Sequence, residues 1–270
     1  MKESAPYLNR DLKITLVGAG NLAWNLVQQW KNFSGIEISY WNRNPQNSTE
    51  LSGIKKGNIL NHPSETNNQT DFVFICSNDS SIEETARLFQ NTKACLVHCS
   101  GSTGISLLKK INPNCAVFYP LQTFSKQIES NWNNIPVFIE AEKLNYEILS
   151  SLAEKMGARA LPVNSEQRLS FHLAAVFACN FTNHLWSVAW EICNNHQLHF
   201  DLLRPLIQQT LDKAFLENNN PAKMQTGPAK RKDFEVIARH LSLLKQSQIN
   251  HDIYELLTKA ISQNPLDEKL

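Results

Sequence analysis

The sequence predicts an α/β Rossmann fold, doubly wound around a mostly parallel sheet, followed by an all-α domain. A short apolar strand, a glycine-rich turn and an amphipathic helix follow one another within residues 13–30. Short apolar runs then alternate with helical stretches as far as Val163, which is the order of a parallel sheet with crossover helices. From Ser165 onward only helical patterns remain. We therefore expect a nucleotide-binding domain at 1–164 and a helical substrate and dimerisation domain at 165–270.

The first strand and its turn have the order that a dinucleotide site requires. Residues 13–17 are a short apolar strand, and Gly18, Gly20 and Ala23 then give the pattern G-x-G-x-x-A. Gly18 permits the tight turn, Gly20 lets the backbone approach a pyrophosphate, and Ala23 lets the next helix pack closely on the sheet. The helix expected over 22–31 then directs its N-terminal N–H groups at the phosphates. A small-residue turn in another kind of α/β protein would show the same pattern.

The end of the second strand, at 36–41, indicates which nicotinamide cofactor fits. A carboxylate at this point would bind the ribose 2′-OH of NAD and repel a 2′-phosphate. The chain has Asn42 and Arg43 here instead of an acid, and a guanidinium suits a phosphate. NADP(H) is therefore favoured over NAD, although a solvated surface arginine would give the same sequence.

Polar residues follow the next buried strand as well. Residues 71–76 are a continuous apolar run, typical of a strand that is buried on both faces. Ser77, Asn78 and Asp79 come directly after it. Because ligands of open parallel sheets bind beyond the carboxyl ends of the strands, these three side chains are placed to contact the ribose or a phosphate of the cofactor.

The loop after the strand expected at 94–97 offers a second polar set. Ser100 and Ser102 have hydroxyl groups, and Gly101 exposes backbone N–H groups to an anion or a carbonyl. A buried core histidine and a functional histidine are equally good interpretations of His98. The other elements expected in this domain are strands at 54–59, 115–119, 136–140 and 159–163, and helices at 82–89 and 144–156.

Residues 165–195 contain no Gly or Pro and are expected to form one long helix. Its first half is apolar almost all round, so it should be buried. His172 lies at the edge of a polar sector that includes Asn180 and Asn183, and polar groups in such surroundings need a partner, either another helix or a ligand. Further helices are expected at 202–217, 234–246 and 251–262.

Composition and charge exclude several classes of partner. The net charge is +1 and basic residues form no tract, so we expect no nucleic-acid partner. No run of 18 apolar residues is present, so no membrane span is expected. The six cysteines include no C-x-x-C pair, so no metal site is expected. We interpret them as buried thiols of a cytoplasmic protein.

Motifs along nearly the whole chain resemble those of a known family. They are GAGNLA, WNRN, FICSNDSS, HCSGS, YPLQTF, FHLAAVFACNFTNHL and TGPAKRKD. Together they resemble a family of bacterial NADP-dependent oxidoreductases, which pair a Rossmann-like domain with a helical C-terminal domain of unknown function. The wider group resembles 6-phosphogluconate dehydrogenase, the β-hydroxyacid dehydrogenases and pyrroline-5-carboxylate reductase. The resemblance implies NADP(H) as cofactor and a C-terminal domain like that of 6-phosphogluconate dehydrogenase, but it identifies no substrate.

The resemblance also implies roles for single residues. The pyrophosphate would lie against the turn Gly18, Ala19, Gly20, Asn21 and Leu22. Asn42 and Arg43 would meet the 2′-phosphate, and Ser77 and Asn78 would line the cofactor. The segment Ser100-Gly101-Ser102, with His98 beside it, corresponds to the segment that binds a substrate carboxylate in β-hydroxyacid dehydrogenases.

The same resemblance has one departure that concerns catalysis. β-Hydroxyacid dehydrogenases place a lysine on the long helix as general acid, with an asparagine one turn later, but residues 165–211 contain no lysine. His172 is the nearest group of suitable pKa, because histidine titrates near pH 6.5. Asn180 and Asn183 are its candidate hydrogen-bond partners, and Ser100 completes the candidate catalytic set.

Two functions follow from these patterns. The first is an NADP(H)-dependent oxidoreductase that transfers hydride to or from a small carbonyl, hydroxy-acid or imine substrate, with His172 as proton donor. The second is a non-catalytic NADP-binding sensor or assembly module, which the missing lysine favours. Arg231 either binds an anionic substrate or belongs to a loop before a helix that starts at Asp233. The aromatic side chains on the helices of the second domain predict a homodimer. In such a dimer the two subunits could share the site.

Overall fold

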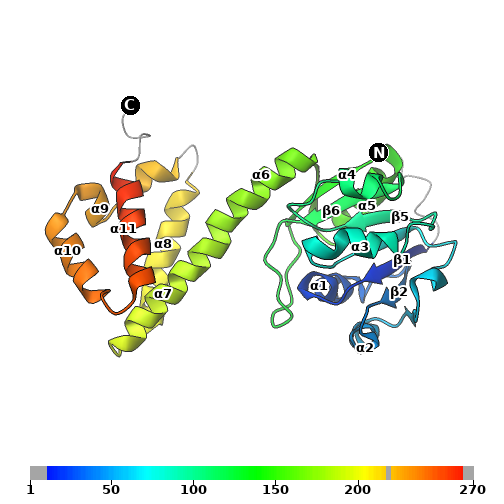
Figure 1. Ribbon diagram of the computed structural model, residues 1–270, viewed down its shortest axis with the longest axis horizontal. Coiled ribbons are helices and arrows are strands. Elements are labelled where there is room, and N and C mark those ends of the chain that lie inside the picture. Colours follow the sequence, from blue (N-terminus) through cyan, green and yellow to red (C-terminus); the bar gives the residue numbers. More distant parts are fainter. Residues whose placement is uncertain (1–10, 217–219, 264–270) are drawn as a thin grey trace. The chain divides into compact units, whose positions relative to one another are not determined.

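The computed structural model describes residues 11–216 and 220–263 (Figure 1). The chain divides into two compact units, Met1–Asn180 and Phe181–Leu270. This division falls inside a helical stretch that begins at Ser165. The functional border at 164/165 therefore stays a prediction.

The first unit contains one eight-stranded sheet. The strand order is β3-β2-β1-β4-β5-β6-β7-β8, and all neighbours are parallel except β6 and β7, which are antiparallel. The strands are β1 (Leu12–Val17), β2 (Ile36–Trp41), β3 (Asn58–Ile59), β4 (Phe72–Ile75), β5 (Cys95–His98), β6 (Cys115–Pro120), β7 (Pro136–Ala141) and β8 (Arg159–Pro162). The predicted Rossmann-like, mostly parallel sheet is confirmed. Strand order reverses between β1 and β4, and open sheets bind ligands at such a point.

The helices of this unit include two, α2 and α4, that were not predicted from the sequence. They are α1 (Asn21–Trp30), α2 (Pro45–Ile54), α3 (Ile82–Arg87), α4 (Ser106–Lys109), α5 (Lys143–Lys155) and α6 (Ser165–Ala175), with 3-10 turns at Pro63–Glu65 and Asp79–Ser81. Helix α2 was not expected, and the strand predicted over 54–59 shrinks to β3. Asn44 caps α2 by accepting the Gln46 N–H, and Pro45 occupies the first helical position, where its missing N–H costs nothing.

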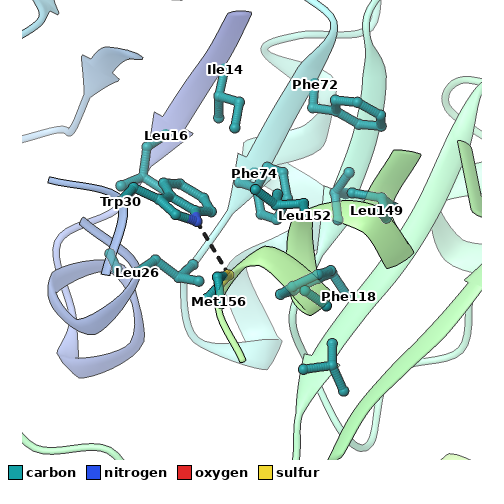
Figure 2. Close-up of a cluster of buried hydrophobic side chains, with 14 of the residues drawn as sticks. Ile14, Leu16, Leu26, Trp30, Phe72, Phe74, Phe118, Leu149, Leu152 and Met156 are labelled. Carbon is teal, nitrogen blue, oxygen red and sulfur yellow. Dashed lines mark hydrogen bonds between the residues drawn. The ribbon is translucent and has the colours of Figure 1, made fainter. Parts of the chain in front are cut away.

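Helices cover both faces of the sheet and create two apolar cores. Alternate strand residues point to opposite faces, so Phe74 joins one core and Val73 the other. The first core also takes side chains from α1 and α5, and the second takes them from α3 and α4. Figure 2 shows the first core, in which the Trp30 ring N–H of α1 donates to the Met156 sulfur at 3.3 Å. The strands whose ends form the candidate site are thereby packed on both faces.

The long helix predicted over 165–195 is interrupted. A π-helical segment, Val176–Phe181, separates α6 from α7 (Thr182–Asn195). Because a π turn holds more residues than an α turn, α6 and α7 do not share one continuous helical repeat. The prediction that the first half is buried is wrong for the single chain. Leu173 is 58% exposed and Phe177 is 63% exposed, although both belong to the apolar pattern from which burial was predicted.

The second unit is entirely helical in its described part. After α7 it contains a 3-10 turn (Phe200–Leu203), α8 (Arg204–Ala214), a 3-10 turn (Pro221–Met224), α9 (Pro228–Arg231), α10 (Phe234–Leu243) and α11 (Gln248–Ser262). Of its described residues only Ala229 is buried. Apolar side chains such as Leu202, Phe215 and Phe234 are 72%, 81% and 73% exposed. Across the described part of the whole chain, no helix has both the length and the apolar character needed to cross a membrane.

Candidate functional site

The turn between β1 and α1 has the shape of a phosphate cradle. Gly18 has φ +97°, and a Cβ there would lie 2.6 Å from the backbone oxygen of Cys76, so only glycine fits without a shift. A Cβ on Gly20 would meet nothing within 4 Å, which means that the space above this residue is open. Helix α1 begins without a side-chain cap and without an acid in its first turn, so its N-terminal N–H groups are free of an internal anion. These residues fit a pyrophosphate.

The predicted 2′-phosphate residues lie at the end of β2. The Arg43 guanidinium forms an ion pair with Glu84 of α3 at 2.7 Å, and both side chains are mostly exposed. Asn42 uses its side-chain oxygen to accept the backbone N–H of Asn44 at 2.9 Å. Exposed ion pairs contribute little to stability, so Arg43 can exchange its carboxylate partner for a phosphate at little cost.

The residues after β4 lie at the same edge of the sheet. The Ser77 hydroxyl is buried and has no hydrogen-bond partner among the described residues, as expected of a group that awaits a ligand. Asn78 and Asp79 are exposed. Asn78 accepts the Ser81 hydroxyl hydrogen at its backbone oxygen, which fixes the turn that follows β4.

His98 ends β5 and is completely buried. Its Nδ1 accepts the Ser100 backbone N–H at 3.2 Å, so in the neutral ring the proton is on Nε2, which has no partner among the described atoms. Burial first, and then the nearby Arg168 charge, lower the pKa of His98 to about 3, while Asp79 opposes the shift. This placement agrees with the core interpretation of His98, and contact between its ring and a substrate stays a prediction.

The loop after β5 is shaped by its own hydroxyl groups. Ser100 Oγ is buried and accepts the backbone N–H groups of Ser102 and Thr103 at 3.1 and 2.9 Å. The Ser102 hydroxyl is exposed and donates to the Asp79 carboxylate. The structure therefore brings together two strand-end loops, and it gives Ser100 a shaping role in addition to its predicted catalytic one.

His172 lies directly above this loop. A Cβ on Gly101 would be 2.7 Å from His172 Nδ1 and 2.8 Å from the Tyr119 ring, so only glycine allows the two rings to come this close. The Tyr119 hydroxyl and His172 Nδ1 lie at hydrogen-bond distance, 3.1 Å. Burial raises the pKa of Tyr119, the Asp79 charge raises it further, and Arg168 opposes both. The motif YPLQTF contains Tyr119, but its phenol was not predicted to be functional.

A second residue that the sequence analysis missed fixes α6 on the sheet. Arg168 is completely buried, and its guanidinium donates to Glu140 of β7 at 2.6 Å and to the Thr103 backbone oxygen at 2.7 Å. Ser165 adds a bond to Glu140 at 2.7 Å and accepts the Ile105 N–H at 3.0 Å. The residues of α6 gave little signal of this role, because Arg168 stands among other polar residues of the helix, such as Glu166 and Gln167.

Three further predicted residues lie at the end of the first unit or in the second unit. Asn180 is exposed in the π-helical segment, and its role as a hydrogen-bond partner of His172 stays a prediction. Asn183 lies in the second unit, where it lines a cleft of about 660 Å³ with Trp186 and Trp190. Arg231 ends α9, and the nearby Asp233 caps α10 by accepting the Val236 N–H at 3.2 Å. The predicted helix start at Asp233 is confirmed, but Arg231 lies in the short helix α9 and not in a loop.

Comparisons with known proteins show which family the chain resembles. A family model described as "Domain of unknown function (DUF2520)" matches residues 135–261. The crystal structure of a Bacteroides fragilis protein described as a "putative NADP oxidoreductase" is similar, with 36% identity, a TM-score of 0.84, and 94% of this chain and 99% of that chain covered. None of the curated proteins compared with the chain matches it.

More distant structures share the fold. A Thermotoga maritima protein is 23% identical, with a TM-score of 0.65, and the match covers 95% of this chain and 100% of that one. A Myxococcus stipitatus imine reductase, solved in complex with NADP+, is 12% identical, with a TM-score of 0.68 and 95% of each chain covered. At these identities the likeness concerns the fold alone.

Proposed function

We propose a reaction for this chain, which belongs to the same family of NADP oxidoreductases as the Bacteroides fragilis protein. The protein is an NADP-dependent oxidoreductase, and its reaction is the reduction of a C=O or C=N group in a small molecule by NADPH. The observation that supports this reaction best is the pair of polar rings, Tyr119 and His172, held above Gly101 at the carboxyl edge of the sheet. Polar groups that could donate a proton meet the predicted substrate loop there.

The cofactor would lie across the point where the strand order reverses. The turn at Gly18–Leu22 would hold the pyrophosphate at the N-terminus of α1, and Asn42 and Arg43 would hold the 2′-phosphate. Ser77, with its unpartnered hydroxyl, and Asn78 would line the path toward the nicotinamide. When bound, NADPH supplies the hydride of the reaction.

The chain's own residues supply position and a proton. In the loop Ser100-Gly101-Ser102, Gly101 is buried and the Ser102 hydroxyl is exposed to the substrate. The shape of the loop depends on the bonds that Ser100 Oγ accepts. His172 donates the proton to the substrate oxygen or nitrogen. The Tyr119 hydroxyl, hydrogen-bonded to His172 Nδ1, fixes the ring and can return a proton to it. In this arrangement His172 takes the role that a lysine has in β-hydroxyacid dehydrogenases, so the lack of a lysine in residues 165–211 does not prevent the reaction.

Replacement of either ring tests the reaction. His172→Ala and Tyr119→Phe should each lower kcat/KM with NADPH by about 100-fold or more, the usual contribution of a general acid, while the Kd for NADPH changes less than about threefold. The measurement is NADPH oxidation with a panel of ketones, ketoacids, aldehydes and cyclic imines.

The second unit offers a matched control, because His240 Nδ1 and the Tyr254 hydroxyl form the same kind of pair at 2.8 Å. His240→Ala should keep its activity. Full activity in His172→Ala would contradict the assignment. NADPH binding without turnover on every substrate, in wild type as well, would favour the sensor function instead.

The second unit also supports a homodimer. Helices α7, α8, α10 and α11 contain no buried residue, although each has apolar side chains along it. A helical unit with so little apolar burial does not offset its chain entropy alone. We propose that a second copy of the chain covers these faces, and that residues 165–270 serve dimerisation and substrate closure. The six cysteines are all free, which supports a place in the reducing cytoplasm.

A further inference from the structure

One carboxylate, that of Asp79, is hydrogen-bonded to the proposed substrate loop. Asp79 follows β4 and accepts a hydrogen bond from the Ser102 hydroxyl, which belongs to the loop after β5. Both residues are exposed, so a molecule seated on Ser102 would be next to this carboxylate. The negative charge of Asp79 also acts on Tyr119, whose pKa is raised first by burial and then by Asp79. The carboxylate therefore belongs to the same site as the two rings.

The other charges at this edge are already paired or absent. Arg43 pairs with Glu84, and the buried Arg168 pairs with Glu140. His98 is neutral at pH 7, because burial lowers its pKa to about 3. Within residues 11–216 and 220–263, no ion pair includes Asp79. The carboxylate thus leaves the loop with a net negative charge.

We propose that Asp79 selects a positively charged substrate, a protonated imine, for the reductase site. The inference rests on the proposed function. The sequence-based expectation was an anionic or carbonyl-containing substrate, and the inference reverses the anionic alternative. That expectation depended on Ser100-Gly101-Ser102 as a carboxylate site, whereas the Ser102 hydroxyl is already donated to an anion. A substrate carboxylate on this loop would meet a like charge at close range, and a cationic C=N group would meet an opposite charge.

The hydride step with such a substrate balances without a further reactant. The C4–H bond of the dihydronicotinamide breaks, and its hydride forms a C–H bond at the carbon of the protonated C=N group. The π electron pair moves to nitrogen, so the imine is reduced to an amine and NADPH is oxidised to NADP+. The nitrogen bears its proton before the hydride arrives, and the His172–Tyr119 pair keeps it protonated in the site.

Binding of two matched ligands to the NADP+-loaded, full-length protein tests the selection. Cyclopentylammonium and cyclopentanecarboxylate have the same ring and opposite charges at pH 7.5, and calorimetry gives the Kd of each. We expect the cation to bind at least about tenfold more tightly, the effect of one nearby charge in partly screened surroundings. Asp79→Asn keeps an acceptor for the Ser102 hydroxyl, and it should bring the two Kd values within about threefold of each other.

Glu83→Gln is the charge-matched control, because Glu83 lies in α3 and is paired with Arg87 at 2.7 Å. It should leave the tenfold ratio unchanged. Equal binding of the two ligands, tighter binding of the anion, no binding of either, or a ratio that survives Asp79→Asn would overturn the selection by Asp79. NADP+ uptake is measured first in the same cell. Uptake of NADP+ with no charge preference would refute this inference alone, whereas no uptake would refute the proposed function as well.

Discussion

His98 links the stability of the first unit to pH. Its side chain is completely buried, and burial lowers its pKa from 6.5 to about 3. Below pH 6.5 the unfolded chain binds a proton that the folded chain does not, so stability is present above this pH and is lost as the pH falls toward 3. At pH 5 the loss is about 2 kcal/mol, from about 1.4 kcal/mol for each pH unit.

Urea unfolding at pH 7.5 and pH 5 measures this term directly. The wild type should lose about 2 kcal/mol more between the two pH values than His98→Asn, in which the titrating ring is gone. If both proteins lose the same amount, the histidine is protonated in the folded state and the assigned tautomer is wrong.

At the residue scale the sequence showed which groups reach the carboxyl edge, but not which of them meet. Gly18, Ser77 and Ser102 each follow a strand. The carboxyl ends of parallel strands meet at one edge of the sheet, so such residues lie near one another. The Tyr119–His172 bond joins residues 53 positions apart, and no local pattern fixes that distance. Arg43 was expected to meet a phosphate, and its exposed pairing with Glu84 depends on where α3 lies.

At the scale of elements, a buried ionic network attaches α6 to β7. Arg168 is 1% exposed at its side chain and Glu140 is 21% exposed, so loss of one partner leaves a poorly hydrated charge. Arg168→Met should lower the free energy of unfolding by about 3 kcal/mol, the lower end of what removal of one partner costs. Because both partners vanish together in Arg168→Met/Glu140→Gln, this double variant should lose clearly less than the sum of the two single losses.

Denaturant unfolding of the two single variants and the double variant measures this coupling. Simple additivity would show that the pair does not hold α6 in place. The double variant should also keep NADPH affinity, since neither side chain belongs to the proposed cofactor cradle.

The elements themselves were predicted well where periodicity is strong. The strands β1, β2 and β4 to β8 and the helices α1 and α5 lie within a few residues of their expected positions. Helix α2 was missed because its residues Pro45–Ile54 are mostly polar. The only sequence signals of its start are the Asn44 cap and Pro45. The π-helical segment was missed because nothing in the residues Val176–Phe181 breaks an α-helical pattern.

At the scale of the whole molecule, the second unit needs a covering partner. Its described residues include only one buried side chain, Ala229, while Trp190, Leu206 and Phe215 are 53%, 64% and 81% exposed. Sedimentation at micromolar concentration should give a species of twice 30.7 kDa. A lone 30.7 kDa species would contradict the homodimer, and a charged substitution such as Leu206→Glu should shift a true dimer toward the monomer.

The claim on which the account depends is that the folded protein binds NADP(H) at the turn after β1. The most direct measurement is a fluorescence titration with NADPH and NADH, on the wild type and on Arg43→Leu. We expect saturable binding of NADPH, weaker binding of NADH, and near-equal binding of the two cofactors once Arg43 is removed, because its guanidinium pairs with the 2′-phosphate. A folded wild-type protein that takes up neither nucleotide would contradict the account.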